Sequence, residues 1–502
     1  MASCGSPDAF SWLQTLPPLS QWKTNSMSMC ICSSNPSHPS LNFSVVRTSI
    51  SSNTFTFSIV ANFKLPISLW TSKPFRITTS DANKFLTEEM ISTLLTGFID
   101  VVLSYGIKRT SCSIRIPNPS SSPNLADVFN LGFHTFVFLV CIYEAPISLR
   151  TVCLNTIKNQ LVTCRSRQGS KLLMVQLGSN LEELWMRSLN LAITNWMVEI
   201  RAAKQRPLLQ SPSPLFSYGF STQGLWKVHL YCPVIAMEME NSPSSGLNDE
   251  RLFFSLNYHQ LEGVIQFNHR IFVHDKWINV AVNIDNVRCD VIRLVNETLL
   301  SERGYGAEEK HFPSRISLRL TPTVQSNILM VSVTKSSENP TREFEVEKGF
   351  EATVDPPNTF FGLKVSAGET TTTSLKPWKF EEWVNGYSAN LTWFLHDADD
   401  GREVSSSKPS KVSLMNPRAW FKNRYSSAFR PFNRQGGVVF AGDNYGQSVL
   451  WKVDKAAAAG KVMEFELRGC IWLTYWPNRH HTFYNDTRKL EFREMLYLNL
   501  PY

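Results

Sequence analysis

The chain has 502 residues, of which 43% are hydrophobic and 18% are charged, and its mean hydropathy is -0.16. This composition excludes a wholly disordered chain, a collagen-like fibre and a coiled coil, and it argues against a polytopic membrane protein. The net charge is +8, and the excess lies in the first part: residues 1–220 hold 18 Lys and Arg against 10 Asp and Glu, whereas residues 221–502 hold 32 of each. We expect a soluble protein of roughly two to four domains.

The N-terminal segment, residues 1–40, is rich in serine and is interrupted by prolines such as Pro17 and Pro36, which predicts irregular structure. Its scarcity of acidic residues is typical of plastid transit peptides, but arginine is also scarce, and Trp12 and Trp22 resemble packing residues. No secretory pattern occurs. We therefore expect an intracellular location, in the cytoplasm or the nucleus, with the chloroplast as the alternative.

The ten cysteines are scattered along the chain and include no Cys-x-x-Cys pair. The closest pair, Cys30 and Cys32, has no second cluster to complete a zinc site, and others lie in apolar runs, as Cys141 does. This pattern predicts free thiols in a reducing compartment. We expect no metal and no cofactor.

Residues 41–206 are predicted to combine a β-hairpin with a helical domain. Leu41–Ile50 and Thr54–Leu65 are apolar, β-branched runs, and a short polar turn joins them. From Ile91 to Tyr105 the apolar residues recur at three and four positions, which indicates an amphipathic helix.

A second helix is predicted over Val128–Tyr143. It spans 16 residues, fewer than the ~20 that a membrane crossing needs, and it contains Asn130 and His134. We therefore predict a buried core helix and no integral membrane span. A third helix begins at Pro146, and a capping box at Ser179 precedes an apolar stripe that ends near residue 204.

Residues 207–220 are rich in proline and serine and are predicted to be a linker. Residues 221–502 show short runs of period-two alternation between turn signals. The runs are Trp226–Val234, Ile271–Ile284, Ile316–Leu320, Ile328–Val333, Leu391–Leu395, Val438–Phe440, Val449–Val453, Met463–Leu467 and Ile471–Trp476. The sequence thus predicts a multidomain α+β fold, in which the helical domain precedes one large antiparallel β-sandwich or two smaller ones.

The best candidate binding site is a stretch in which basic and aromatic residues alternate and no acidic residue occurs. Basic side chains neutralise phosphate or sulfate, and aromatic rings stack on bases or sugars. The alternative is a loop whose aromatic residues anchor it to the core. The candidate ligand-binding residues are Arg418, Trp420, Lys422, Arg424, Tyr425, Arg430 and Arg434.

A second candidate site rests on tryptophan, because half of the 14 tryptophans lie between Trp378 and Trp476. An exposed row of indoles would suit a sugar-binding face, although burial in the core is the commoner role of tryptophan. Glu464 and Glu466 are two residues apart on one predicted strand, so that they share a face. They could form a glycosidase pair, or they could simply be the polar side of that strand.

Other chemistry-bearing patterns are weak. His480 and His481 are adjacent and would point to opposite faces of a strand, and residues 396–401 resemble a calcium loop without its closing glutamate. Motifs for hydrolases, metalloproteases, dinucleotides and P-loops are absent from the sequence. We therefore favour a protein that is not an enzyme.

Several strings along nearly the whole chain are similar to a family of plant proteins of uncharacterised function. Examples are LGSNLEELWMRSLNLAITNW and GCIWLTYWPNRHHTFYNDTRKLEFRE. The resemblance implies a plant source. It carries no functional residues with it.

The sequence predicts a non-enzymatic binding or adaptor protein whose partner is an anionic ligand or an acidic protein, with nucleic acid included among the candidates. A carbohydrate-binding or carbohydrate-active β-sandwich with a tryptophan-rich face is the alternative. A third possibility is peripheral membrane association through the helical region.

Replacing Arg424 and Arg430 together by Glu should abolish binding of the anionic ligand, because the change reverses two positive charges in the basic-aromatic stretch. Binding would be measured at two salt concentrations against anionic vesicles, RNA, DNA and glycans. Unchanged binding by the double variant would contradict the assignment.

Overall fold

The fold is that of a computed structural model. The described residues are 8–18, 21–33, 39–49, 54–62, 65–76, 86–106, 125–165, 168–202, 215–240, 250–296, 311–333, 342–348, 369–375, 378–395, 438–441, 448–475 and 486–502. We call residues 8–202 of this set the N-terminal unit and the remainder the two-sheet unit.

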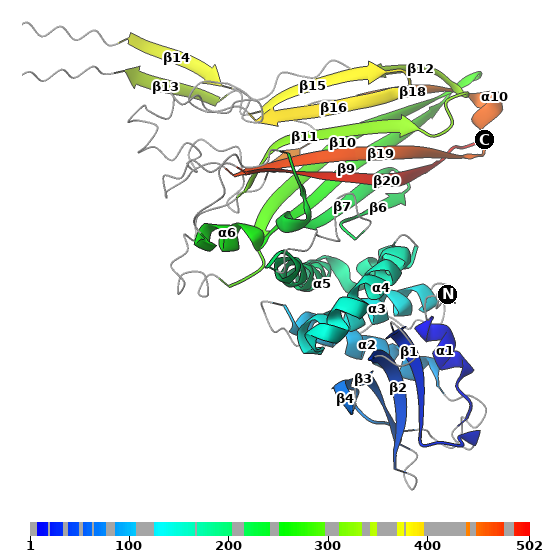
Figure 1. The fold of residues 1–502 in the computed structure, drawn as a ribbon. Coiled ribbons are helices and arrows are strands. Elements are labelled where there is room, and N and C mark those ends of the chain that lie inside the picture. The colour runs from blue at the N-terminus through cyan, green and yellow to red at the C-terminus, as the bar shows by residue number, and fades with distance from the viewer. Residues whose placement is uncertain are drawn as a thin grey trace, which may run out of the picture.

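Helices and strands alternate in blocks along the chain (Figure 1). The helices are α1 (Ala9–Thr15), α2 (Glu88–Ser104), α3 (Leu125–Glu144), α4 (Ile147–Arg165), α5 (Gln168–Ala202), η4 (Val234–Ala236), α6 (Glu250–Asn257) and α10 (Lys455–Ala458). The strands of the N-terminal unit are β1 (Ser26–Ser33), β2 (Ser40–Ser49), β3 (Thr54–Asn62), β4 (Pro66–Thr71) and β5 (Phe75–Arg76). Those of the two-sheet unit are β6 (Ser217–Thr222), β7 (Leu225–Pro233), β8 (Glu238–Met239), β9 (His259–Val273), β10 (Trp277–Arg293), β11 (Phe312–Pro322), β12 (Ile328–Val333), β13 (Arg342–Lys348), β14 (Glu369–Leu375), β15 (Trp378–Asn385), β16 (Ser388–Leu395), β17 (Val438–Ala441), β18 (Ser448–Asp454), β19 (Val462–Tyr475) and β20 (Asp486–Asn499).

The N-terminal unit packs a small antiparallel sheet, β1–β2–β3–β4 with β5 beside β3, against helices. The predicted hairpin is confirmed, since β2 and β3 pair along their length. Alternate residues of these strands face the helices: Phe43 of β2 stacks on Phe57 of β3 at 5.5 Å and meets Phe133 of α3 at 4.9 Å. Period-two alternation thus places one apolar face of the sheet on the helical layer.

The predicted core helix is also confirmed. Every residue of α3 from Val128 to Ile142 is buried. Within the part of the chain that the structure describes, α3 alone is long and apolar enough to cross a membrane, and most of it lies inside the protein. Its neighbour α2 packs along it, with the rings of Phe98 and Phe136 stacked at 4.6 Å.

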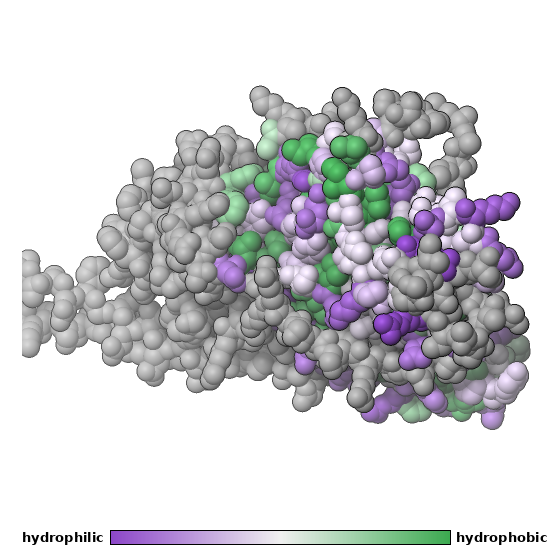
Figure 2. All heavy atoms as spheres, turned by 90° about the horizontal axis from the view of Figure 1, so that it is seen from below, coloured by the Kyte–Doolittle hydropathy of each residue, from purple (hydrophilic) through white to green (hydrophobic). Residues whose placement is uncertain are grey.

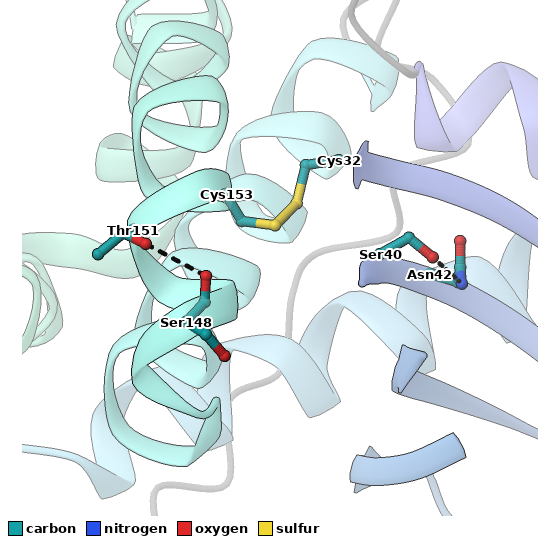
Figure 3. Close-up of a disulfide and its surroundings, with 6 residues drawn as sticks. All are labelled: Cys32, Ser40, Asn42, Ser148, Thr151 and Cys153. Carbon is teal, nitrogen blue, oxygen red and sulfur yellow. Dashed lines mark hydrogen bonds between the residues drawn. A yellow bond between two sulfur atoms is a disulfide. The ribbon is translucent and has the colours of Figure 1, made fainter. Parts of the chain in front are cut away.

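A disulfide between Cys32 of β1 and Cys153 of α4 ties the N-terminal sheet to the helices (Figure 3). The expectation of free thiols is therefore wrong at these two positions. The two cysteines are 121 positions apart in the sequence, so no local spacing indicates that they pair. Both are buried, and their Cα atoms lie 5.5 Å apart, within the normal range for a disulfide.

The helix that follows, α5, contains a break at Gly178, whose φ is +74°. A left-handed residue of this kind is favoured by glycine and ends one helical segment before the next begins. The predicted capping box starts at the following residue, Ser179, so the local sequence accounts for the kink.

The two-sheet unit contains two large antiparallel sheets (Figure 1). Among the described residues, sheet B has the order β12–β18–β10–β9–β7–β6, with β17 beside β10, and sheet C has the order β15–β16–β11–β19–β20–β8. Large rings join their inner faces: Phe465 of sheet C lies 5.1 Å from Trp226 and 5.0 Å from Trp451, both of sheet B. The prediction of a mixed helical and antiparallel protein is confirmed at this level.

One close contact in sheet C favours the observed register of β19 and β20. Gly469 lies opposite Phe492, and a Cβ on Gly469 would meet the Phe492 ring at 1.9 Å. A glycine beneath an aromatic ring lets the ring cover the backbone. The inner positions on either side, such as Leu467 and Ile471, are fully buried.

The structure differs from the sequence-based expectations in several elements. Within residues 1–40, where irregular structure was expected, it has α1 and β1. The run Ile271–Ile284 was expected to be one strand but is divided by a turn at 274–276 into the ends of β9 and β10. Conversely, Met463–Leu467 and Ile471–Trp476, expected to be separate, belong to β19, which is described up to Tyr475.

Figure 2 shows the protein from the side on which the N-terminal unit lies. Hydrophobic and hydrophilic side chains are mixed over short distances on this face. Single exposed apolar residues also occur in this unit, for example Leu65, which is 75% exposed, and Ile67, which is 48% exposed. Scattered residues of this kind are normal on protein surfaces.

Replacing Cys32 and Cys153 together by Ala should lower the free energy of unfolding by about 3 kcal/mol, because the disulfide restricts the unfolded chain over a long loop. Urea denaturation followed by circular dichroism measures the change. A reducing agent should destabilise the natural protein and leave the double variant unaffected. Alkylation of both thiols in the unreduced protein would contradict the disulfide.

Candidate functional site

Three arginines lie side by side on the outer face of sheet C, one from each of three neighbouring strands. Arg319 of β11 is paired in register with Arg468 of β19, and Arg468 is paired with Arg493 of β20. Residues that precede or follow them, such as Leu318 and Leu467, are buried on the inner face. The alternation of the strands therefore directs the three guanidinium groups outward, and all three residues are exposed. We call these three residues the arginine row.

The arginine row is only partly neutralised. The carboxylate of Glu466, two residues before Arg468, lies 3.0 Å from Arg468 Nε and also contacts Arg493. Arg319 donates a hydrogen bond to the hydroxyl oxygen of Ser388 at 3.4 Å. No described carboxylate lies within ion-pair distance of Arg319. Like charges on directly opposite strand positions repel each other, so a bound anion would stabilise the row.

An exposed indole lies at the end of the same cross-strand row. Trp383 of β15 is opposite Asn390 of β16, and Asn390 is opposite Arg319. Trp383 is 45% exposed. The face therefore combines cations with an aromatic ring, the same pairing of residue types that the sequence predicts at another place in the chain.

A cross-strand row four residues away along β11 is more enclosed. The Arg315 guanidinium lies over the rings of Phe394 and Trp472, at 4.9 and 4.4 Å from their centroids. Trp472 is 7% exposed, and its ring nitrogen donates to Glu240 at 3.1 Å. Arg315 thus packs as a cation on aromatic faces.

The predicted basic-aromatic stretch lies outside the described residues. This applies to Arg418, Trp420, Lys422, Arg424, Tyr425, Arg430 and Arg434, and also to His480, His481 and residues 396–401. The arginine row was missed in the sequence. Its only local signal is the outward position of Arg315 and Arg319 in an alternating strand; the pairing with Arg468 and Arg493 comes from the fold.

The tryptophans expected to form a sugar-binding face are divided between core and surface. Trp393 and Trp451 are fully buried, and Trp472 is nearly so, whereas Trp383 is exposed. Trp420 and Trp476 lie outside the described residues. Burial in the core is therefore the observed role for Trp393 and Trp451, as expected for side chains with so large an apolar area. Trp472 is instead covered on the outer face, where Arg315 lies over its ring.

Glu464 and Glu466 share the outer face of β19, as their spacing predicts. Glu464 is exposed, whereas Glu466 is held by the two arginines described above. This carboxylate is therefore engaged in ion pairs on the outer face. The pair thus has the character of a polar outer face.

A buried polar chain links the two sheets where the strands β9, β11 and β20 begin. The Nδ1 atoms of His259 and His311 lie 3.2 Å apart, His311 Nε2 lies 3.5 Å from the Asp486 carboxylate, and Arg488 donates to that carboxylate at 2.7 Å. All four residues are buried. The described residues contain no cluster of three or more metal-ligating side chains. The contact between His259 and His311 therefore joins sheet B to sheet C, whereas the charged pair Asp486–Arg488 lies within β20 of sheet C.

The environment shifts the pKa values of two of these groups. Burial lowers the pKa of His311, so that it is held neutral in the interior. Burial alone would raise the pKa of Asp486, but His311 and Arg488 outweigh it and hold the pKa at about 2. The buried charge pair is thus Asp486 with Arg488, and the His311 ring orients the carboxylate.

A second buried cluster joins α5 to the outer face of sheet B. Arg187 donates two hydrogen bonds to the Glu262 carboxylate, at 2.7 and 2.9 Å, and Asn190 donates to the backbone oxygen of Tyr231 at 3.1 Å and to Gln260 at 2.7 Å. Burial raises the pKa of Glu262, and the Arg187 guanidinium opposes that rise. A bidentate pair fixes orientation as well as distance. We call this cluster the α5 junction.

The preceding turn of α5 extends the α5 junction. Glu182 accepts hydrogen bonds from the hydroxyl groups of Tyr218 and Tyr231, the latter at 2.9 Å. Burial raises the pKa of Tyr231, and the Glu182 carboxylate adds to the rise. The junction therefore holds the two units together.

No protein-family model matches the sequence, and none of the curated proteins matches it at a significant level. Among solved structures, the chain is similar to the Clostridium perfringens delta-toxin, at 7% identity over 56% of this chain and 99% of the toxin, with a TM-score of 0.19. A second similar structure is the Clostridium perfringens NetB toxin in its membrane-inserted form, at 9% identity over 57% of this chain and 95% of the toxin, with a TM-score of 0.20. At such TM-scores these likenesses carry no statement about the fold or activity of this chain.

Replacing Asp486 by Asn should flatten the acid dependence of stability. The folded-state pKa of Asp486, about 2, lies below its ordinary value of 3.8, so its stabilisation is present above pH 3.8 and is lost as the pH falls toward 2. The lowered pKa of His311 acts in the same direction, because the unfolded state takes up a proton first as the pH falls below 6.5.

Urea midpoints measured from pH 7 to pH 2 test this prediction. The Asp486→Asn variant should lose about 3 kcal/mol at pH 7, because Arg488 is left without its charged partner, and it should lose less than the natural protein on acidification. Asp275→Asn, at an exposed turn, is the control and should follow the natural protein. An equally steep acid dependence in both variants would show that the buried pair is not responsible.

Proposed function

We propose that the protein is a non-enzymatic binding protein, that its two large sheets form a β-sandwich, and that an anionic ligand binds on the outer face of sheet C. The ring contacts between the inner faces of sheets B and C support the sandwich. A binding function is also what the sequence predicts, and here it is proposed for residues that the structure describes.

The single observation that carries the proposal is the arginine row. Arg319, Arg468 and Arg493 occupy directly opposite positions on three strands, and one carboxylate, Glu466, pairs with two of them. Neighbouring strands are about 4.8 Å apart, so adjacent guanidinium groups can contact one phosphate, sulfate or carboxylate group together. Trp383 at the end of the row offers a stacking face.

A carbohydrate-binding role is the alternative, and it depends on Trp383. An exposed indole can stack on the apolar face of a sugar ring. If the protein binds carbohydrate, the Trp383→Ala variant should bind a neutral glycan more weakly than the natural protein does. If it binds anions, an anion without rings should bind the variant and the natural protein equally well. The two functions are therefore separable at this residue.

Replacing Arg319 and Arg468 together by Glu should weaken anion binding by about 100-fold, since each charge-assisted hydrogen bond contributes about 1.5 kcal/mol. Binding of heparin, a DNA oligonucleotide and polyglutamate would be titrated at low and high salt with the full chain. Binding by the natural protein should weaken as salt increases.

The matched control is Arg270→Glu, which reverses the charge of an exposed arginine on β9 of sheet B. It should leave the affinity nearly unchanged. Equal losses of affinity in the control and in the double variant would show that only the net charge of the protein matters. Loss of binding only in the variant with Arg424 and Arg430 replaced would move the site to the basic-aromatic stretch.

A further inference from the structure

One end of the two-sheet unit, which we call the distal end, is formed by turns that the structure describes (Figure 1). The strand registers place the β9–β10 turn, the β11–β12 turn and the α10 segment at the same end: Trp277 is paired with Asp454, and Ile328 with Val453. The segments of the distal end are 222–225, 272–277, 322–330, 385–388 and 452–462.

Backbone hydrogen bonds join these turns into one surface. Lys455 donates to the backbone oxygen of Lys276 at 3.3 Å, and Asp454 donates to that of Asn327 at 2.8 Å. The β11–β12 turn is further tied to β19, because Thr323 donates to the backbone oxygen of Glu464 at 3.0 Å. Side chains that protrude from separate turns therefore keep fixed relative positions.

Large apolar side chains are exposed over this surface. They are Phe272 (51% exposed), Val273 (43%), Val324 (59%), Leu329 (55%), Met330 (49%) and Val462 (56%). They come from three turns and the strand ends beside them, and the strand registers place Met330, Lys452 and Phe272 in one cross-strand row. A gathering of exposed apolar residues marks an interaction surface.

The charges at the distal end favour an anionic partner. Segments 222–225, 322–330 and 385–388 contain no charged residue, whereas the other two contain Lys276, Lys452, Lys455 and Lys461 against Asp275 and Asp454. The Asp454 carboxylate accepts the backbone N–H of Ala456 and so caps α10. The Lys452 ammonium lies 3.8 Å from the Trp277 ring centroid, close to the apolar group.

We propose that the distal end docks on the surface of an anionic lipid bilayer. Apolar side chains on separate turns can each enter the headgroup region without a matching cavity, and flanking lysines gain about 1 kcal/mol each near anionic lipid. The inference goes beyond the proposed anion site, because Arg468 lies six residues along β19 from Val462, about 20 Å away. No helix crosses the bilayer in this arrangement.

The test is co-sedimentation of the full chain with vesicles of phosphatidylcholine alone and with added phosphatidylserine. The natural protein should sediment with the anionic vesicles, and Val324→Asp with Val462→Asp should weaken that binding at least about tenfold. The control is Leu65→Asp, which changes an even more exposed apolar residue, in the N-terminal unit; this variant should bind as the natural protein does. The pair Val324→Ser and Val462→Ser provides a milder change should the acidic variant fold poorly, and it should also reduce binding.

Each other outcome overturns the inference. Absence of binding to anionic vesicles at low salt, or equal loss in Leu65→Asp, would exclude docking by the distal end. If vesicle binding were lost only in the variant with Arg319 and Arg468 replaced by Glu, the lipid contact would belong to the arginine row. Self-association that the Val324 and Val462 changes abolish, without vesicle binding, would make a second copy of the chain the partner.

Discussion

The register of β19 against β20 is the constraint on which the two-sheet unit depends. A shift of β20 by one residue would turn Phe492 outward and carry Arg493 into the core, at a cost of several kcal/mol for the unpaired charge. The Phe492 ring over Gly469 opposes that shift, because any larger residue would collide with the ring. The pairing of β11 with β19 aligns Arg319 with Arg468, so the packing of the core determines the charge pattern of the outer face.

Local patterns predicted the elements that local forces determine. The hairpin of β2 and β3, the buried α3 and the break before Ser179 follow from alternation, helical spacing and a capping box. The pairing of strands that are far apart in the sequence could not be predicted. Arg319 and Arg468 come together only because β11 and β19 are neighbours in sheet C, and nothing in either strand's sequence specifies its partner.

Residue type predicted burial or exposure less well than position in the fold. The clustered tryptophans suggested a surface, yet Trp393 and Trp451 complete the core, because an indole buries more apolar area than any other side chain. Conversely, the exposed apolar residues of the distal end are an ordinary phenylalanine, valines, leucine and methionine, whose exposure depends on their place in turns and at strand ends. The polar contacts that position the units, such as Arg187 with Glu262, also join residues far apart in the sequence.

The disulfide between Cys32 and Cys153 makes most of the N-terminal unit a covalent ring. Strands β2 to β5 and helices α2 and α3 all lie within it. A protease that cuts the chain once inside this ring would leave two fragments still joined, and they would separate on a denaturing gel only after reduction. The loops between these elements can therefore be opened without releasing the first strand from the helices on which it packs.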